Sequence, residues 1–441
     1  MKSRGLLVAA IVLAALTGTL YWSNHRKSLT SAADSAVESP PKILTLQPAD
    51  VTALSIRKKD GDSVVLSKNG SGQWKITAPR VLAADQDAVS SVLSTLSSLN
   101  SDRLVEDKAA SFDQYGLAQP SIEVAITKKD GKTQKLLIGD DTPTSSGAYA
   151  TLAGDTRVFT MASYNKSALL KNATDLRDKR LLIFDSDKVS SIELTAKKQT
   201  IAFGRSKDEW QIVKPKPFRA DRSQVEDLLR TLRDAKMDLN ASEDEQKKAA
   251  AFSAGTPLAT ARVTDVSGTQ ELQIRKNKDD YYAKSSAVAG VYKILSGTGA
   301  GLDKGLDDFR NKKLFDFGFV DPDKIEFHNG SKSYFLTHSG SDWWSNGAKM
   351  DPGTVSALID KIRDLSASKF PESGFAGPMI DLTVTSDGGK RTEKILISKN
   401  GDNFVAKRQD EPALYELTAS AVAELQKSAA DLKPAPPPAK K

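Results

Sequence analysis

The clearest pattern in this chain is an apolar face that recurs three times at helical spacing. In each run the apolar residues occupy the first, fourth, fifth and eighth positions, which lie on one side of a helix. They are Val89, Val92, Leu93 and Leu96, then Val225, Leu228, Leu229 and Leu232, then Val355, Leu358, Ile359 and Ile362. An aspartate precedes each run by four residues, where its side chain can accept an unpaired backbone N–H. We therefore predict three amphipathic helices with Asp85, Asp221 and Asp351 as N-caps.

Alternating apolar residues before and after each helical run predict β-strands. Pairs such as Leu54/Ile56 begin the pattern, and glycine-containing turns such as Asp60-Gly61 and Asn329-Gly330 separate neighbouring strands. Turns of this kind connect antiparallel strands. The order strand, strand, strand, helix, hairpin, strands, helix occurs in all three repeats. We therefore predict an α+β fold of three tandem repeats, each an antiparallel sheet with helices on one face.

A tryptophan marks the same strand in each repeat. Trp74, Trp210 and Trp344 follow one another at intervals of about 135 residues, and each precedes a capped helix. Because side chains alternate along a strand, we predict that these three tryptophans are equivalent core anchors. Trp343 adjoins Trp344, so one of the two must face outward, and we predict that Trp343 is the exposed contact.

This repeat pattern gives the domain boundaries. The repeats are assigned to residues 42–180, 181–316 and 317–431. Residues 28–41 are rich in Ser and Ala and end in two prolines, which is typical of a flexible tether. Residues 432–441 form a proline-rich basic tail for which no packing is expected.

The N-terminus, residues 1–27, is predicted to anchor the chain in a membrane. Residues 5–22 carry no charge and are mostly apolar, and as a helix they would be about 27 Å long, enough to span a bilayer. Tyr21 and Trp22 suit the membrane interface. A cleaved signal peptide is the alternative, although no clear cleavage site follows the apolar run. We expect a retained anchor in the inner membrane with the body in the periplasm.

The charge and composition of the chain exclude several classes of function. The net charge of +7 comes mostly from the two ends, so the body between them is nearly neutral. A nucleic-acid partner is therefore not expected. Cysteine is absent, which excludes disulfides, thiolate metal ligands and cysteine nucleophiles.

The motifs that carry chemistry in other proteins are weak here. The run Gly297-x-Gly299-x-Gly301 lacks the spacing and the Lys-Ser/Thr pair of phosphate-binding loops. His328 and His338 are not expected to converge, and adjacent carboxylates such as Asp307-Asp308, which lie near a helix end, form no convergent pair by spacing alone. We predict no catalytic residue, no cofactor and no metal site. Carboxylates from different repeats that meet in one cleft remain the route to an enzyme.

Several motifs resemble a known bacterial family. They are Trp74-Lys-Ile76-x-x-Pro79, Ala84-Asp85 and Tyr115-Gly-Leu117-x-x-Pro120, with weaker copies at Trp210-Gln-Ile212-x-x-Pro215 and Phe375-Ala-Gly377-Pro378. The chain resembles the repeated domain of unknown function with the serial number four-three-four-zero, and the resemblance covers residues 42–431. It implies membrane-anchored exported proteins that are often encoded beside ABC-type permeases. The family has no established catalytic residues.

Together these features predict a non-enzymatic accessory or scaffold protein. It would be bound to the inner membrane through residues 5–22 and would have a permease or another envelope protein as its partner. One alternative is a periplasmic module that binds glycan, peptide or lipid. A second is an enzyme with a carboxylate site between repeats.

Overall fold

The computed structural model describes residues 42–207, 209–239 and 244–437. The predicted anchor, the tether and residues 438–441 lie outside the described residues. No helix within the described ranges is long and apolar enough to cross a membrane. The chain divides into two compact units, residues 1–179 and 180–441. The described residues form three antiparallel sheets, one in the first unit and two in the second, which confirms the predicted α+β class.

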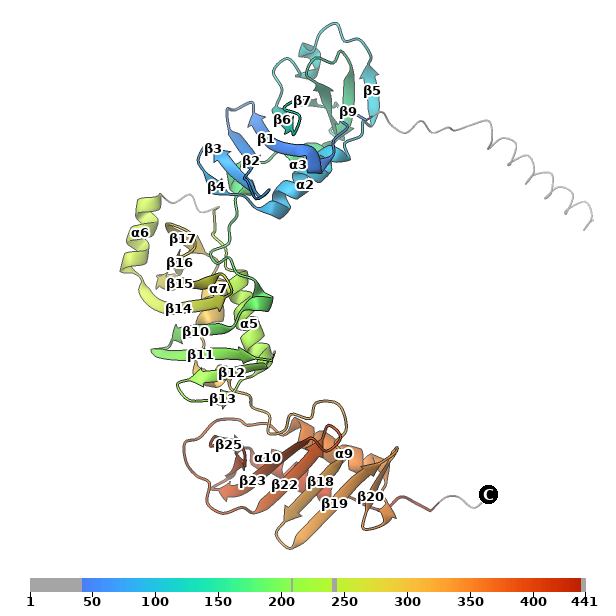
Figure 1. The fold of residues 1–441 in the computed structure, drawn as a ribbon, viewed down its shortest axis with the longest axis vertical. Helices are drawn as coiled ribbons and strands as arrows, with labels where there is room; N and C mark the ends of the chain where they lie inside the picture. Colours follow the sequence, from blue (N-terminus) through green and yellow to red (C-terminus); the bar gives the residue numbers. More distant parts are fainter. Residues whose placement is uncertain (1–41, 208, 240–243, 438–441) are drawn as a thin grey trace, which may run out of the picture. The chain divides into compact units, whose positions relative to one another are not determined.

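The first repeat is built on a nine-stranded sheet (Figure 1). Its strands are β1 (Val51–Lys58), β2 (Ser63–Lys68), β3 (Trp74–Ala78), β4 (Leu82–Ala83), β5 (Arg103–Glu106), β6 (Ile122–Lys128), β7 (Thr133–Asp141), β8 (Gly147–Leu152) and β9 (Val158–Ala162). Its helices are η1 (Pro48–Asp50), α2 (Gln86–Ser97), η2 (Asp113–Tyr115), α3 (Ser163–Leu169) and α4 (Ala173–Leu176). The strand order is β4-β3-β2-β1-β6-β7-β8-β9-β5. One face of this sheet and the apolar side of α2 form a single buried cluster.

The second repeat has an eight-stranded sheet of the same plan. Its strands are β10 (Ser191–Ala196), β11 (Gln199–Ser206), β12 (Glu209–Lys214), β13 (Phe218–Arg219), β14 (Thr256–Asp265), β15 (Gly268–Asn277), β16 (Asp280–Ser285) and β17 (Val291–Ile294). Its helices are η3 (Ser186–Lys188), α5 (Arg222–Arg233), α6 (Glu245–Ala254), α7 (Ser296–Leu302) and α8 (Leu306–Phe309). The strand order is β13-β12-β11-β10-β14-β15-β16-β17, and α5 shares its core.

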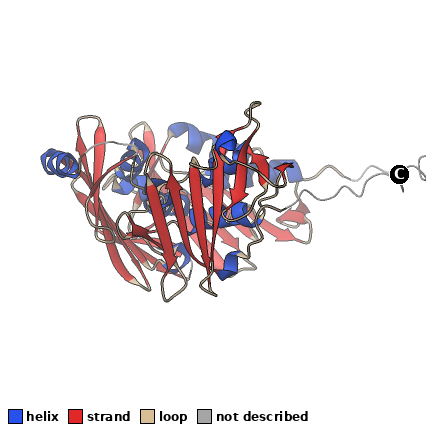
Figure 2. Ribbon diagram, turned by 90° about the horizontal axis from the view of Figure 1, so that it is seen from above, coloured by secondary structure: helices blue, strands red, loops and turns tan. Residues whose placement is uncertain are grey.

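The third repeat has an eight-stranded sheet with the same strand order as the second. Its strands are β18 (Lys324–Asn329), β19 (Lys332–Ser339), β20 (Asp342–Ser345), β21 (Ala348–Lys349), β22 (Ile380–Ser386), β23 (Arg391–Asn400), β24 (Asn403–Arg408) and β25 (Leu414–Leu417). Its helices are α9 (Pro352–Asp364) and α10 (Ala419–Ala430). The strand order is β21-β20-β19-β18-β22-β23-β24-β25. In Figure 2 the strands lie side by side as broad sheets with helices against them, and α9 and α10 pack against each other.

The three predicted helix N-caps are in place. The Asp85 carboxylate accepts the backbone N–H groups of Asp87 and Ala88, at 3.1 and 3.0 Å. Asp221 and Asp351 accept the N–H groups of Gln224 and Thr354, at 3.2 and 3.0 Å. Each cap is also tied to the closing segment of its own repeat. The N–H groups of the three aspartates bond to carbonyls in those segments, which are Leu176, Phe309 and Lys433.

In the third repeat the prediction that Trp344 is the core anchor and Trp343 the exposed contact is wrong. Trp74 and Trp210 are buried as predicted, but the third buried residue is Trp343, 6% exposed, while Trp344 is 39% exposed. The cross-strand neighbours of the buried tryptophans are Lys68, Arg205 and His338. Each lies on its tryptophan ring, at 5.1, 5.7 and 4.9 Å between the cation or ring and the indole centroid. Trp343 is therefore the equivalent residue.

The register changes because the third repeat shortens the connection after this strand. The first two repeats use a longer loop that contains Pro79 or Pro215. The third uses a tight turn at Asn346 and Gly347, both with positive φ, between β20 and β21. Trp343 lies three residues closer to its helix cap than Trp74 does, and adjacent strand residues face opposite sides of the sheet.

The structure also shifts two predicted boundaries. Leu314 and Phe315 belong to the core of the third repeat, which therefore begins before residue 317. The start of the tail is not unpacked, because Leu432 contacts the same core and Pro434 bridges to Met350. The Ala435 N–H also bonds to the Lys349 carbonyl at 2.8 Å. These contacts add the start of the tail to the edge of the third sheet.

Candidate functional site at the joint of the second and third repeats

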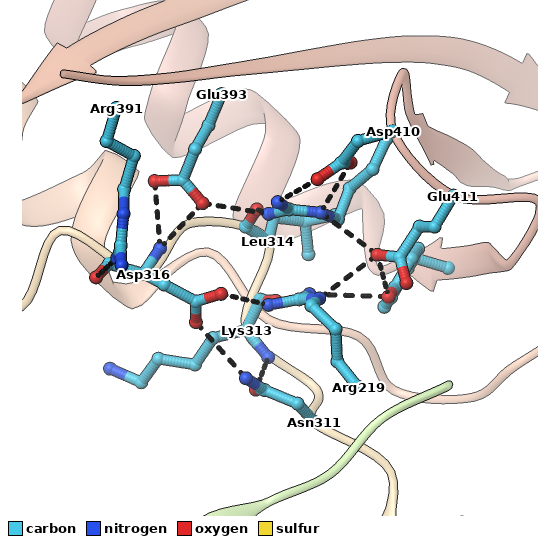
Figure 3. A network of polar contacts seen from close by, with 11 residues as sticks. Arg219, Asn311, Lys313, Leu314, Asp316, Arg391, Glu393, Asp410 and Glu411 are labelled. Carbon is cyan, nitrogen blue, oxygen red and sulfur yellow. Dashed lines mark hydrogen bonds and ion pairs between the residues drawn. The ribbon is translucent and has the colours of Figure 1, made fainter. Parts of the chain in front are cut away.

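Charged side chains concentrate where the second repeat meets the third inside the second compact unit (Figure 3). We call this group the arginine joint. It consists of Arg219 from β13, Asp316 from the opening segment of the third repeat, Glu393 from β23, Arg408 from β24, Asp410 and Glu411 from the following loop, and Tyr415 from β25. Arg219 is held at the sheet edge because β13 pairs with β12, where Gln211 lies opposite it. Arg219 thus presents its guanidinium to the third repeat.

Arg219 binds four groups of the third repeat. Its Nη1 lies 2.5 Å from Asp316 Oδ2, and its Nε lies 3.1 Å from Glu411 Oε1. Its Nη2 donates to the Lys313 carbonyl and, at 3.3 Å, to the Tyr415 hydroxyl. A planar guanidinium with several donors suits such a cluster of oxygens better than a lysine ammonium would.

Arg408 is the buried partner of this arrangement. Its side chain and that of Glu393 are 4% and 5% exposed, and the Arg408 Nη1 to Glu393 Oε1 distance is 3.1 Å. Its Nη2 lies 2.9 Å from Asp410 Oδ2, and its Nε lies 2.9 Å from Glu411 Oε1. Arg408 also donates to the Leu314 carbonyl. Glu411 therefore joins the two arginines through a single carboxylate oxygen.

The backbone of the opening segment completes the network. The Asp316 N–H donates to both carboxylate oxygens of Glu393, each at 3.1 Å. Arg391 donates to the Asp316 carbonyl at 2.7 Å, and Asn311 donates to the Asp316 carboxylate at 3.1 Å. Each carboxylate of the joint thus has an arginine or a backbone N–H as partner. Such pairing is required most at Glu393, whose side chain is buried.

The ionisation of the joint follows from burial and from these pairs. Burial would by itself lower the pKa of Arg219, but Tyr415, Asp316 and Glu411 raise it above the ordinary value. Burial, together with the nearby Glu411, raises the pKa of Tyr415 to about 12 against the opposing charge of Arg219. Burial would raise the pKa of Asp410, but the hydrogen bond and charge of Arg408 hold it below the ordinary range. At neutral pH both arginines are charged and Tyr415 is a neutral hydroxyl.

A third arginine, Arg310, lies beside the joint between two aromatic rings. Its guanidinium carbon is 4.2 Å from the ring centroid of Phe218 in the second repeat and 3.7 Å from that of Phe370 in the third. Its Nη1 lies 3.6 Å from Asp307 Oδ1. Burial lowers the pKa of Arg310. Desolvated cation–π contacts of this kind contribute about 2 kcal/mol each, so Arg310 fastens the two repeats by stacking.

An open cleft of about 760 Å³ adjoins Arg310. Its apolar lining comes from both repeats and includes Pro215, Phe218, Leu306, Phe370, Pro371, Pro412 and Leu414. Its charged lining consists of Lys216, Asp307, Asp308, Arg310 and Glu372. The volume falls in the range of small-ligand and peptide sites. Carboxylates from both repeats line this cleft, where Asp307 is engaged by Arg310 and Asp308 accepts the Gly305 N–H at 2.7 Å.

Of the residues singled out from the sequence, Pro215, Asp307 and Asp308 line this cleft, whereas the predicted caps and core anchors do not. Asp85, Asp221 and Asp351 cap helices, and Trp74, Trp210 and Trp343 lie in the three cores. Trp344 is half-exposed and lies on the open face of the third sheet, as does Phe335 at a similar exposure. Among the residues that the structure describes, no cluster of His, Asp or Glu could hold a metal ion.

Sequence reasoning missed the arginine joint, and a departure from the repeat could have found it. The register of the sheets aligns Arg219 with Ala83, and Arg408 with Ser285. Arg408 is therefore an addition to an otherwise shared plan, and Arg219 is one relative to the first repeat, while the third repeat has Lys349 in that position. A position where one copy of a repeat acquires a charge is a candidate contact, and that comparison was available from the sequence.

Comparison with protein families gives two matches to one model, DUF4340, described as a domain of unknown function. The matches cover residues 74–211 and 210–381, which together are more than half of the chain. The chain belongs to this family. Comparisons with curated proteins and with solved structures gave no match.

The two DUF4340 matches start about as far apart as the first two structural repeats do, but each match starts at a later point within its repeat. Each match begins at a buried tryptophan, Trp74 or Trp210, while each repeat begins about 30 residues earlier with its opening segment. The first match therefore runs from the third strand of the first sheet to the third strand of the second sheet, β12. The second match runs from β12 to β22, the fifth strand of the third sheet along the chain. Arg219 and Asp316 of the arginine joint lie within the second match. The other members, from β23 to β25, follow its end.

Proposed function

We propose that this DUF4340 protein is a non-enzymatic scaffold or accessory protein of the bacterial envelope. In this proposal residues 5–22 anchor it in the inner membrane, and the body lies in the periplasm. The uncharged N-terminal stretch behind Lys2 and Arg4 and the nearly neutral body support this location. The family resemblance supports an ABC-type permease or another envelope complex as the partner.

The arginine joint is the observation that carries the proposal. A network of charged side chains in the second unit joins two modules, and its carboxylates are occupied by arginines or backbone N–H groups. A general acid or base would need a proton-carrying group turned toward a substrate. These groups are turned toward one another. Such an arrangement fixes the distance between two modules, which is what a scaffold requires.

Affinity purification of the tagged full chain from detergent-solubilised membranes tests the role. We expect an envelope protein to be recovered with the wild type and lost when any one repeat is deleted. Arg219→Ala should weaken recovery, whereas Arg230→Ala, which removes an exposed pair with Asp227 on α5, should not. A chain that is recovered alone, in membranes that contain its candidate partners, would contradict the proposal.

The location is tested separately with spheroplasts. External protease should digest residues 28–441 if the body is periplasmic. Full protection of the body, with digestion after detergent is added, would place it on the other side of the membrane.

A ligand-binding role is the second candidate, favoured by the cleft beside Arg310 and by the half-exposed Trp344. It predicts that one repeat pair suffices for binding and that no protein partner is needed. Retention of a glycan, peptide or lipid by the purified chain would favour it. The enzyme alternative has Asp307, Asp308 and Glu372 in one cleft as its support. Turnover of any substrate that is lost in Glu372→Gln would revive it.

A further inference from the structure

The cleft beside Arg310 has the lining of a site for an extended, basic, proline-containing peptide. Phe218, Phe370 and three prolines supply flat apolar walls, which suit the rings of a polyproline helix. Arg310 is neutralised by its pair with Asp307, so the remaining charges are Asp308 and Glu372 against Lys216. The site carries one more negative than positive charge, and Glu372 is exposed.

The chain itself contains a segment of this chemistry. Residues 436–441 read Pro-Pro-Pro-Ala-Lys-Lys. The segment leaves the third sheet directly after Ala435, which bonds to Lys349, and Pro436 and Pro437 are exposed. A polyproline segment needs no backbone partners and loses little conformational entropy on binding, because its prolines are already restricted.

This segment is too short to reach the cleft of its own chain. It starts beyond β21 at one edge of the third sheet, while Leu414 of the cleft lies in β25 at the other edge. Eight strand spacings of about 4.8 Å separate them, or about 38 Å. Six residues of polyproline helix span only about 19 Å. An occupant from this chain must therefore come from another molecule.

We propose that the cleft binds residues 436–441 of a second copy of this chain. The prolines would lie between Phe218 and Phe370 on one side and Pro412 on the other, and Lys440 or Lys441 would pair with Glu372. The contact is heterologous, since tail and cleft are different surfaces, so it would join copies head to tail. The proposal goes beyond the scaffold role and does not depend on it.

Fluorescence anisotropy of a labelled peptide of residues 434–441 tests the site. The receptor is the purified chain without residues 436–441, so that its own tail does not compete while Pro434 and Ala435 keep the sheet edge intact. We expect saturable binding below about 1 mM that weakens as salt is added. A peptide with both lysines replaced by glutamate should not bind. Absence of binding by the original peptide at 1 mM would overturn the proposal, taking about 1 mM as the upper bound of a specific weak contact.

Three receptor variants locate the binding. Glu372→Lys should weaken it about fivefold or more, because it removes one exposed ion pair and adds a repulsion. Lys216→Glu should strengthen it, an outcome that misfolding could not produce. Asp402→Lys is the matched control, since Asp402 lies in the turn at the far end of the β23–β24 hairpin. Equal weakening by Glu372→Lys and Asp402→Lys, or no response to Lys216→Glu, would show non-specific attraction and overturn the site.

In the full-length protein the same contact should appear as concentration-dependent self-association. Chemical cross-linking in detergent should give dimers and larger species that disappear when residues 436–441 are removed or when free peptide is added. Dimers that persist without the tail would contradict the proposal. Recovery of an envelope partner by the tail-deleted chain would leave the scaffold function standing, so the two ideas can fail separately.

Discussion

The second and third repeats hold their opening segments with the same geometry and with different chemistry. In the second repeat the Gln270 amide bonds to both the N–H and the carbonyl of Ile183, and Ser285 donates to the Leu181 carbonyl. In the third repeat Glu393 accepts the N–H of Asp316, and Arg408 donates to the Leu314 carbonyl. The strand registers make Gln270 equivalent to Glu393 and Ser285 equivalent to Arg408.

The difference separates what the fold requires from what the joint adds. Both repeats bond the same backbone groups of the opening segment. The bonds to the Leu181 and Leu314 carbonyls are buried, where an unpaired carbonyl would be costly. A neutral amide and a hydroxyl are sufficient in the second repeat. In the third repeat the same groups are held by a carboxylate and a guanidinium, and the guanidinium of Arg408 also contacts Glu411, which binds Arg219. The charges therefore serve the contact between repeats as well as the sheet.

The largest expected difference between the two repeats follows from replacing the side chain that donates to the opening-segment carbonyl, Arg408 in the third repeat and Ser285 in the second. Arg408→Met leaves Glu393, Asp410 and Glu411 without their shared partner and should cost the third repeat about 3–5 kcal/mol. Ser285→Ala removes a neutral donor and should cost the second repeat about 1–2 kcal/mol. Urea unfolding of the purified chain measures the totals, and hydrogen exchange assigns each loss to its sheet.

The control is the double variant Arg408→Met with Glu393→Gln, which places a neutral amide where the second repeat has Gln270. It should recover part of the stability lost by Arg408→Met alone. Equal costs for Arg408→Met and Ser285→Ala would mean that the charges add nothing beyond the backbone bonds.

The shifted tryptophan gives the next largest effect. Trp343→Ala should cost about 3 kcal/mol, as Trp210→Ala should in the second repeat, because both side chains are buried in a core. Trp344→Ala should change stability by less than about 1 kcal/mol, since Trp344 lies on the open face. Intrinsic fluorescence should agree, with Trp344 more readily quenched by acrylamide. A larger loss for Trp344→Ala than for Trp343→Ala would show that the register is misassigned.

The sequence predicted most of the fold because its patterns are local. The spacing of Val225, Leu228, Leu229 and Leu232 and the cap at Asp221 follow from helix geometry, and the structure has both. Trp344 was predicted as the core residue from the interval between the tryptophans of successive repeats, which does not decide between two adjacent tryptophans. The tight turn at Asn346 and Gly347 was visible, but its effect on register requires knowing where the next strand begins.

The joint and the cleft could not be predicted in the same way, because they depend on which surfaces of two repeats meet. Arg219 and Glu411 are far apart in the sequence, and neither belongs to a recognisable motif. Their distance of 3.1 Å is set by the packing of β13 against the loop before β25. What the sequence does record is that Ala83 and Ser285 occupy the positions of Arg219 and Arg408 in other repeats.

Removing the Arg219 side chain should weaken the contact between the second and third repeats at a smaller cost in stability than Arg408→Met. Arg219→Ala should cost about 2 kcal/mol, less than Arg408→Met, because the Arg219 side chain is 21% exposed and Glu411 keeps Arg408 as a partner. A double-mutant cycle with Glu411→Gln should give a coupling energy above about 1 kcal/mol. Arg230→Ala on the exposed side of α5 should cost at most about 0.5 kcal/mol. Additive effects of the two joint variants would mean that Arg219 and Glu411 do not act together.

The smallest expected effect is a loss of stability in alkali that belongs to the third repeat. The folded state raises the pKa of Tyr415 to about 12, whereas the unfolded chain has the ordinary value near 10. Below pH of about 10 the hydroxyl is protonated in both states, and its contribution is fully present. As the pH rises toward about 12 the unfolded chain ionises first, so up to about 2 kcal/mol of the free energy of unfolding is lost in that window.

Tyr415→Phe should flatten this part of the stability profile against pH, while Tyr164→Phe, at an exposed position, should leave it unchanged. The Tyr415 hydroxyl bonds to Glu411 at 2.5 Å and receives a bond from Arg219, whereas the equivalent Tyr292 donates to the Ala289 carbonyl. An alkaline transition that persists in Tyr415→Phe would assign the loss to other groups and would remove Tyr415 from the set that distinguishes the third repeat.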